Sequence, residues 1–349
     1  MRRVSYEAPR AYEFALVGNA VDGKRMFYSP SQIVLTDSRK VLGSCVGCVE
    51  APCLSFNQAE LAQPAVIDSG FSPDTAVCPT GAIRQGESRV PIVDRSHCIG
   101  CGVCVLRCPF GAISLNPDDG TARVTPPAEP DFIELGVDNQ TTEDSTNARI
   151  KRVLRSDAPE DANGDISRQF LRFADVLPLV ADPQRTMRLL ARNSFLVADL
   201  PARLRIAGDS NSWVDMISSV GNQVLIVEIE PGPDTLDAVR RVLSGAAIAM
   251  NRYHLDANSI LGAVVFPRLP NNRVEFYRVL QDIKNRIGLS IVPLPIALMQ
   301  LTTRCGGTPL RVYLDSYASS GTSLSVSSIA LELFGDFGDP VVVGLEPPK

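Results

Sequence analysis

The chain has 349 residues, of which 45% are hydrophobic and 21% are charged, so it is long enough for two or three globular domains. It has no run of about 18 or more apolar residues, and its N-terminal arginines precede no apolar stretch, which argues against a membrane span and a secretory signal. The net charge of −5 lies in the first part, where residues 1–148 carry 12 Lys and Arg against 18 Asp and Glu. We therefore expect a cytoplasmic protein in which clustered thiols bind metal rather than form disulfides.

The pattern of the chain predicts two domains joined by a linker. Residues 1–40 suggest short strands and turns, and cysteine motifs follow them. A long segment after these motifs is rich in Pro, Asp, Asn and Thr and lacks apolar periodicity, which is typical of a linker. The predicted parts are an N-terminal domain, 1–115, a linker, 116–165, a second domain, 166–315, and a C-terminal extension of unknown role, 316–349.

The second domain alternates helical and extended patterns. Apolar residues at three-to-four spacing predict helices over 166–180 and 183–200, and Asp182 with Pro183 is a typical N-cap and first-turn pair. The elements predicted next are, in chain order, strands 202–207, 212–220 and 223–230, a helix 234–253, a strand 259–266, a helix 274–287 and a strand 289–299.

Eight of the nine cysteines form two related motifs. The second motif, CIGCGVCVLRCP, contains Cys98, Cys101, Cys104 and Cys108, and the first contains Cys45, Cys48, Cys53 and Cys78. Two-residue spacers let three thiolates wrap one iron–sulfur cube, while the fourth cysteine, followed by proline, points to another cluster. The motifs resemble those of bacterial-type ferredoxins, which implies an α+β domain that holds two [4Fe–4S] clusters.

The resemblance also implies a crossed ligand set. One cluster takes Cys45, Cys48, Cys53 and Cys108, and the other takes Cys98, Cys101, Cys104 and Cys78. The chain departs from the family in a four-residue spacer after Cys48 and in an insertion over 54–77. Zinc is the alternative, because paired cysteines also form tetrahedral sites, but zinc sites lack the run of four with its trailing proline.

Three acids mark the second domain. The order helix, three-strand meander, helix, strand, helix, strand resembles the PD-(D/E)xK restriction-endonuclease-like superfamily, which implies an α/β domain with a mixed central sheet flanked by helices. In that family an acid on the second strand and Glu-x-Lys on the third strand are catalytic; Asp215, Glu228 and Glu230 stand at these positions, with Glu230 replacing the lysine. Three converging carboxylates can hold Mg²⁺, which polarises phosphate. The alternative is that these acids are only the polar rim of a sheet.

These features predict a metal-dependent DNA endonuclease whose clusters are structural or sense redox state, possible roles being genome defence or DNA processing. Its expected partners are DNA and a second copy of the chain, because many endonucleases of this superfamily cut as dimers. A different class of function is an electron-transfer ferredoxin whose second domain docks a redox partner protein. A third prediction is an inactive, DNA-binding member of the nuclease superfamily.

Overall fold

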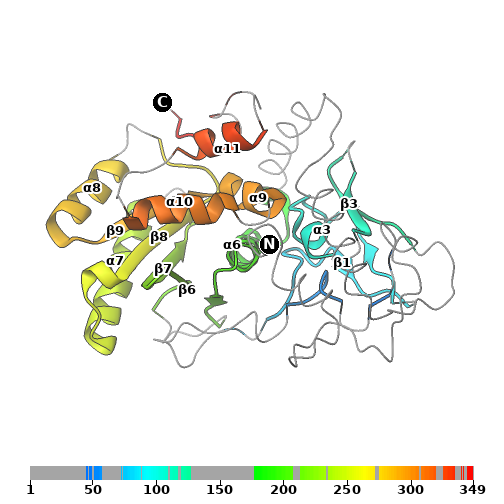
Figure 1. Ribbon diagram of the computed structural model, residues 1–349, viewed down its shortest axis with the longest axis horizontal. Helices are drawn as coiled ribbons and strands as arrows, with labels where there is room; N and C mark the ends of the chain where they lie inside the picture. Colours follow the sequence, from blue (N-terminus) through cyan, green and yellow to red (C-terminus); the bar gives the residue numbers. More distant parts are fainter. Residues whose placement is uncertain are drawn as a thin grey trace, which may run out of the picture.

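The computed structural model describes five stretches of the chain, residues 45–56, 72–126, 177–206, 213–271 and 275–348, with short gaps inside them. The gaps are residues 46, 49, 50, 73, 88, 109, 110, 117, 118, 233, 234, 306, 307, 320–324, 335–338, 340, 342 and 343. The strands predicted in 1–40 and most of the helix predicted over 166–180 lie outside the described residues; only a 3₁₀ turn, Leu177–Leu179, is seen of the latter. Figure 1 shows a cysteine-rich half beside a larger half built on a sheet.

The cysteine-rich half consists of two small hairpins around one short helix. β1 (Ile83–Arg84) pairs antiparallel with β2 (Ile92–Val93), and β3 (Ile113–Leu115) pairs antiparallel with β4 (Ala122–Val124). The helix α3 (Val103–Arg107) lies between the hairpins in sequence. Ile83, Ile113 and Ala122 are buried in the core cluster that contains the cysteines, so each hairpin packs one side against them.

The predicted linker begins too early. β4 lies inside it, and the next residue, Thr125, donates its N–H to Ala112 at 2.8 Å and accepts from Cys45 N at 2.9 Å. A three-residue strand is too short to show an alternating pattern, so the sequence could not reveal it. The cysteine-rich half therefore extends at least to Thr125, and residues 127–165 lie outside the described part of the chain.

The larger half contains a five-stranded mixed sheet in the order β5-β6-β7-β8-β9. The first three strands form the predicted antiparallel meander, and β8 and β9 add in parallel, which confirms the mixed sheet. Gly221, at φ 55°, makes the tight turn between β6 and β7. The strands are β5 (Ala202–Leu204), β6 (Met216–Val220), β7 (Gln223–Ile229), β8 (Ile260–Phe266) and β9 (Ser290–Pro295).

Helices cover both faces of this sheet. α6 (Pro183–Val197) begins as predicted, since the carboxylate of its N-cap Asp182 accepts from Arg185 N at 2.8 Å. α7 (Thr235–Tyr253) packs closely on β8, where a Cβ at Gly262 would come within 2.6 Å of Val242 Cγ1. The other helices are α8 (Phe276–Ile287), α9 (Ile296–Cys305), α10 (Thr308–Ser319) and α11 (Val326–Phe334), with a 3₁₀ turn, Ala257–Ser259, before β8.

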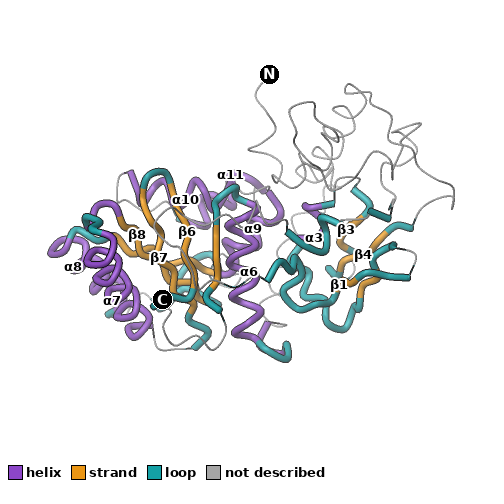
Figure 2. Tube along the Cα trace, turned by 90° about the horizontal axis from the view of Figure 1, so that it is seen from below, coloured by secondary structure: helices purple, strands orange, loops and turns teal. Residues whose placement is uncertain are grey.

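Figure 2 shows these parts as successive layers. α7 and α8 lie on the outer side of the sheet, and α6 and α9 lie between the sheet and the cysteine-rich half. The helices α6 and α9 therefore contact the sheet on one side and the cysteine-rich half on the other, and most of their residues are buried.

Two predictions at the C-terminal end need correction. The strand predicted over 289–299 ends at Pro295, and α9 follows at once. The prediction missed this helix because an unbroken apolar run fits a buried helix as well as a strand. The boundary predicted at residue 316 falls inside α10, whose Leu310 and Leu314 are fully buried in the main core. The C-terminal extension is thus, at least through α10, part of the larger half.

Candidate metal centre

The first group of cysteines lines a hollow at one end of the cysteine-rich half. Its four thiols come from the loop around residues 45–53 and from the residue after α3, and they are Cys45, Cys48, Cys53 and Cys108. All four are buried, and the remaining wall is almost wholly apolar. The hollow measures about 330 Å³ when its open mouth is included.

The second group lines a similar hollow of about 350 Å³. Its thiols are Cys78, Cys98, Cys101 and Cys104. Gly100 and Gly102 form part of the wall with φ of 70° and 81°, a conformation that suits glycine. The structure thus exchanges Cys108 and Cys78 between the two motifs, and the groups are those that the ferredoxin resemblance implies.

Backbone amides point at the sulfur atoms in both groups. In the second group, Ala82 N donates to Cys78 Sγ at 3.1 Å and Ala122 N donates to Cys98 Sγ at 3.2 Å. In the first group, Ala112 N donates to Cys108 Sγ at 3.3 Å. Such donors stabilise negative charge on sulfur, which thiolates bound to iron carry.

The hollows fit iron–sulfur clusters better than free thiols. Burial, and then the neighbouring cysteines, raise the pKa of the Cys104 thiol well above its ordinary value, and burial also raises the pKa of Cys45 and Cys53. These three thiols would therefore stay protonated without metal, whereas metal binding supplies the positive charge that thiolates need. None of the eight forms a disulfide.

A single metal ion fits the described residues poorly. Among them, no three Cys, His, Asp or Glu side chains are placed to hold one metal ion. A structural zinc site needs four ligands at close range around one ion. The zinc alternative therefore finds no support among the described residues.

Buried polar side chains of α6 form hydrogen bonds from the larger half to the cysteine-rich half. Arg192 is 1% exposed and donates to the backbone carbonyls of Asp74 and Ala76, the latter at 2.6 Å. Asn193, fully buried, donates to Val77 O at 2.7 Å. The guanidinium of Arg192 therefore holds the segment that leads into Cys78.

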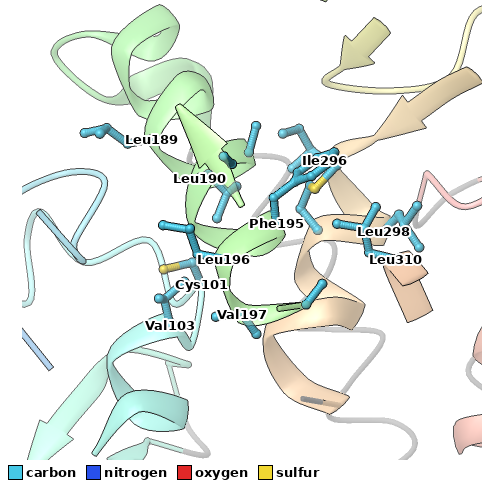
Figure 3. Close-up of a cluster of buried hydrophobic side chains, with 14 of the residues drawn as sticks. Cys101, Val103, Leu189, Leu190, Phe195, Leu196, Val197, Ile296, Leu298 and Leu310 are labelled. Carbon is cyan, nitrogen blue, oxygen red and sulfur yellow. The ribbon is translucent and has the colours of Figure 1, made fainter. Parts of the chain in front are cut away.

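The helix α9 also contacts the cysteine-rich half. The Thr303 hydroxyl donates to Cys101 O at 2.5 Å, so a helix of the larger half binds a cysteine loop directly. Figure 3 shows Cys101 and Val103 packed beside Leu196 and Val197 of α6. Nothing in the cysteine spacing signals this contact, because Cys101 and Thr303 are about 200 residues apart.

The three acids of the second half do come together, but arginines bind them. Asp215 Oδ1 lies 2.6 Å from Arg188 Nη2, and its Oδ2 accepts from Ile229 N. Arg241 donates to Glu228 at 2.9 Å and to Glu230 at 2.7 Å. The carboxylates are thus neutralised by the chain itself, and the predicted Mg²⁺ site finds no support among the described residues.

Glu228 makes the stability of the larger half depend on pH. Burial, and then the negative charge of Asp215, raise its pKa to about 7, although Arg241 opposes the shift. The folded state then binds the proton more tightly than the unfolded state, so stability is highest below the ordinary Glu pKa and falls as pH rises through about 7. We expect wild type to lose about 1 to 3 kcal/mol between pH 5 and pH 8, and Glu228→Gln to lose much less. Denaturant unfolding at several pH values measures the free energy of unfolding of both proteins. The same decrease with pH in wild type and in Glu228→Gln would contradict the prediction.

Comparison with known proteins supports a 4Fe-4S binding domain within the cysteine-rich half. Residues 91–114 match the 4Fe-4S binding domain family. This 4Fe-4S binding domain contains the whole CIGCGVCVLRCP motif, including three cysteines of the second group and one of the first. No solved structure matches the chain.

The similar proteins are iron–sulfur proteins and reductase subunits. An iron–sulfur protein of Rhodospirillum rubrum is 32% identical over 99 residues, which are 28% of this chain and 40% of that protein. The thiosulfate reductase electron transfer subunit PhsB of Salmonella typhi is 39% identical over 88 residues, 25% of this chain and 35% of that subunit. A tetrathionate reductase subunit of Archaeoglobus fulgidus is 44% identical over 45 residues, 13% of this chain and 22% of that subunit. The match thus spans less than half of the length of these relatives.

These relatives overturn the nuclease prediction. They include an electron-transfer subunit and a subunit of another reductase, and nothing in the comparisons indicates a restriction-endonuclease-like domain or DNA binding. The prediction that the chain is a DNA endonuclease is therefore wrong. Asp215, Glu228 and Glu230, the predicted catalytic residues, are paired with arginines in the structure. The sequence misled because acids at the ends of neighbouring strands look the same whether they bind a metal or arginines. In the described part of the chain, no helix is both long and apolar enough to cross a membrane.

Proposed function

We propose that the chain is an electron-transfer protein that carries two [4Fe–4S] clusters and exchanges electrons with a redox partner protein. The observation that carries the proposal is the pair of buried four-cysteine hollows within and around the 4Fe-4S binding domain. The first group, with Cys108, holds one cluster, and the second group, with Cys78, holds the other. When bound, such clusters supply reversible one-electron chemistry.

The chain's own residues bind, orient and shield these clusters. Apolar walls keep water away, which raises the strength of every electrostatic interaction inside. Amides of Ala82, Ala112 and Ala122 donate to cysteine sulfurs and stabilise their negative charge. The larger half supports this arrangement through α6 and α9, so we propose that it is a scaffold for the clusters as well as the part that docks the partner.

Electron transfer is tested by a redox titration of the full chain prepared without oxygen. We expect about eight iron and eight sulfide atoms per chain and two reversible one-electron couples, followed by electron paramagnetic resonance. Reduced methyl viologen should donate electrons to both couples in stopped-flow mixing. Clusters that are present but cannot be reduced and reoxidised would contradict the proposal and leave them a structural role, and a chain without iron would refute the clusters themselves.

A further inference from the structure

The β3–β4 hairpin lies over both cysteine hollows. Its cross-strand pair Ile113 and Val124 lines the first hollow. Its pair Leu115 and Ala122 lines the second hollow. Successive side chains of a strand point to opposite faces, so Arg123, which follows Ala122, points away from the hollows and is exposed. Arg123 therefore lies on the outer side of the hairpin, between the two cysteine groups and one layer of backbone from each.

The β1–β2 hairpin has the same two sides. Ile83 and Val93 pair across the strands and line the second hollow. The next pair, Arg84 and Ile92, points the other way; Arg84 is exposed, and Ile92 is 45% exposed. Because β2 lies beside β4, the outer sides of the two hairpins form one surface.

The turn of the β1–β2 hairpin adds a third arginine at the mouth of the first hollow. Arg89 lines that hollow and is exposed, and its φ of 62° is rare for a residue other than glycine. The turn is held by hydrogen bonds from Gly86 N to Val90 O and from the Gln85 side chain to the carbonyl of Arg89. Residues held in such rare conformations cluster at functional sites. We define the hairpin face by its exposed residues, Arg84, Arg89, Ile92 and Arg123.

The hairpin face is basic, although the chain has a net charge of −5. Among the described residues, no carboxylate forms an ion pair with its three arginines. Two neighbouring acids bind other side chains, Asp94 that of His97 at 2.8 Å and Asp119 that of Arg95 at 2.7 Å. Glu87, exposed in the β1–β2 turn, offsets one of the three positive charges. The face thus keeps a net positive charge.

The hairpin face lies on the side of the cysteine groups that is away from the larger half. Figures 1 and 2 both place α3 between the hairpins and the helices α6 and α9. An electron carrier can bind its donor and its acceptor at once only if it has two contact surfaces. The larger half, which docks one partner in the proposed function, and the hairpin face lie on opposite sides of the cysteine groups.

We propose that the hairpin face is a second electron-exchange surface, which binds a redox partner protein through a cluster of carboxylates on that partner. Arginines bind carboxylates with two parallel hydrogen bonds, and opposite charges speed the encounter of two proteins. A partner bound here lies one hairpin layer from both cysteine groups. In one direction the partner gives one electron to a cluster, in the other it accepts one, and no bond forms or breaks. The inference rests on the proposed function, because it requires reducible clusters.

The test measures how the full chain, loaded with both clusters, binds fluorescently labelled poly-L-glutamate, which stands in for the partner's carboxylates. The triple variant Arg84→Gln/Arg89→Gln/Arg123→Gln should bind it about tenfold more weakly than wild type at low salt. The second measurement is the stopped-flow rate of reduction by the radical anion of bis(sulfonatopropyl) viologen. The triple variant should lower this rate about threefold to tenfold, while the rate with the methyl viologen radical cation stays equal or rises.

The matched control is Arg252→Gln/Arg278→Gln/Arg286→Gln, which removes the same charge from exposed positions on α7 and α8. These helices lie on the outer side of the sheet, so both measurements should change less than about twofold. Equal effects of the two triple variants, or no effect of the first, would overturn the inference while leaving the proposed function intact. Tighter binding of duplex DNA than of poly-L-glutamate, or a wild-type dimer that the first triple variant dissociates, would also overturn it.

Wild type alone decides if the first triple variant does not retain its clusters. Its rate with the radical anion must fall as the salt concentration rises, because salt screens the attraction between opposite charges. A rate that rises or stays constant overturns the inference. Wild type without reducible clusters would refute the proposed function and the inference with it.

Discussion

Replacing Cys104 by serine is expected to lower the iron content from about eight to about four atoms per chain. Cys104 is buried in the second group, where Cys78, Cys98 and Cys101 complete the set. A serine oxygen is a poor substitute for a soft thiolate, so this cluster should be lost. The first group shares none of these four thiols and should keep its cluster. Iron and sulfide analysis, with the loss of one of two redox couples, measures the effect.

Cys305→Ser is the control for this experiment, because Cys305 is the one cysteine outside both motifs. It should retain about eight iron atoms. Cys53→Ser should also leave about four, but with the other couple remaining. If Cys104→Ser and Cys53→Ser remove the same couple, the division into two groups is wrong.

Replacing Arg192 by leucine is expected to lower the free energy of unfolding by about 2 to 5 kcal/mol. The change leaves the partly buried carbonyl of Asp74 without its arginine donor and the carbonyl of Ala76 with only the 3.4 Å contact from Asn193 Nδ2, and losing such a donor costs about 1 to 3 kcal/mol. Because these carbonyls precede Cys78, the loss should loosen the second cysteine group first. Denaturant unfolding followed by cluster absorbance and by far-ultraviolet circular dichroism measures both effects.

Wild type should unfold with coincident transitions by the two probes, since one continuous hydrophobic core contains cysteines of both groups and the helices of the larger half. In Arg192→Leu we expect cluster absorbance to be lost at lower denaturant than helical signal. Arg185→Leu is the matched control: it lies on the same helix and pairs with the side chain of Asp74, but it is 57% exposed. Its effect should stay below about 1 kcal/mol. Similar losses in both variants would show that Arg192 has no special role.

Much of the cysteine site could be predicted from the sequence, because short spacers constrain which thiols can meet. Three cysteines separated by two residues must lie close together, whatever the rest of the chain does. The N-cap at Asp182 and the turn at Gly221 were predictable for the same reason, since each depends on a few adjacent residues. The exchange of Cys78 and Cys108 between groups came from the resemblance to ferredoxins and is seen in the structure.

Contacts between distant segments decided the rest. The sequence shows Arg192 as one of several arginines on a helix, and only packing against residues 74–77 makes it a buried donor. It also shows Glu228 as a strand acid, and only the approach of Arg241 from α7 turns it into an ion pair rather than a metal ligand. The run after Pro295 forms α9, which packs against α6 and α10, and the local apolar pattern does not reveal that packing.

Spacing along the chain thus specifies the two cysteine motifs, the cofactor class and the order of the secondary-structure elements. Folding in three dimensions was needed to show that the two halves share one core, with Thr303 bound to the Cys101 loop. It was also needed to show that arginines neutralise the acids of the sheet. Burial and ion pairing depend on which distant side chains come into contact, and the local sequence pattern does not predict those contacts.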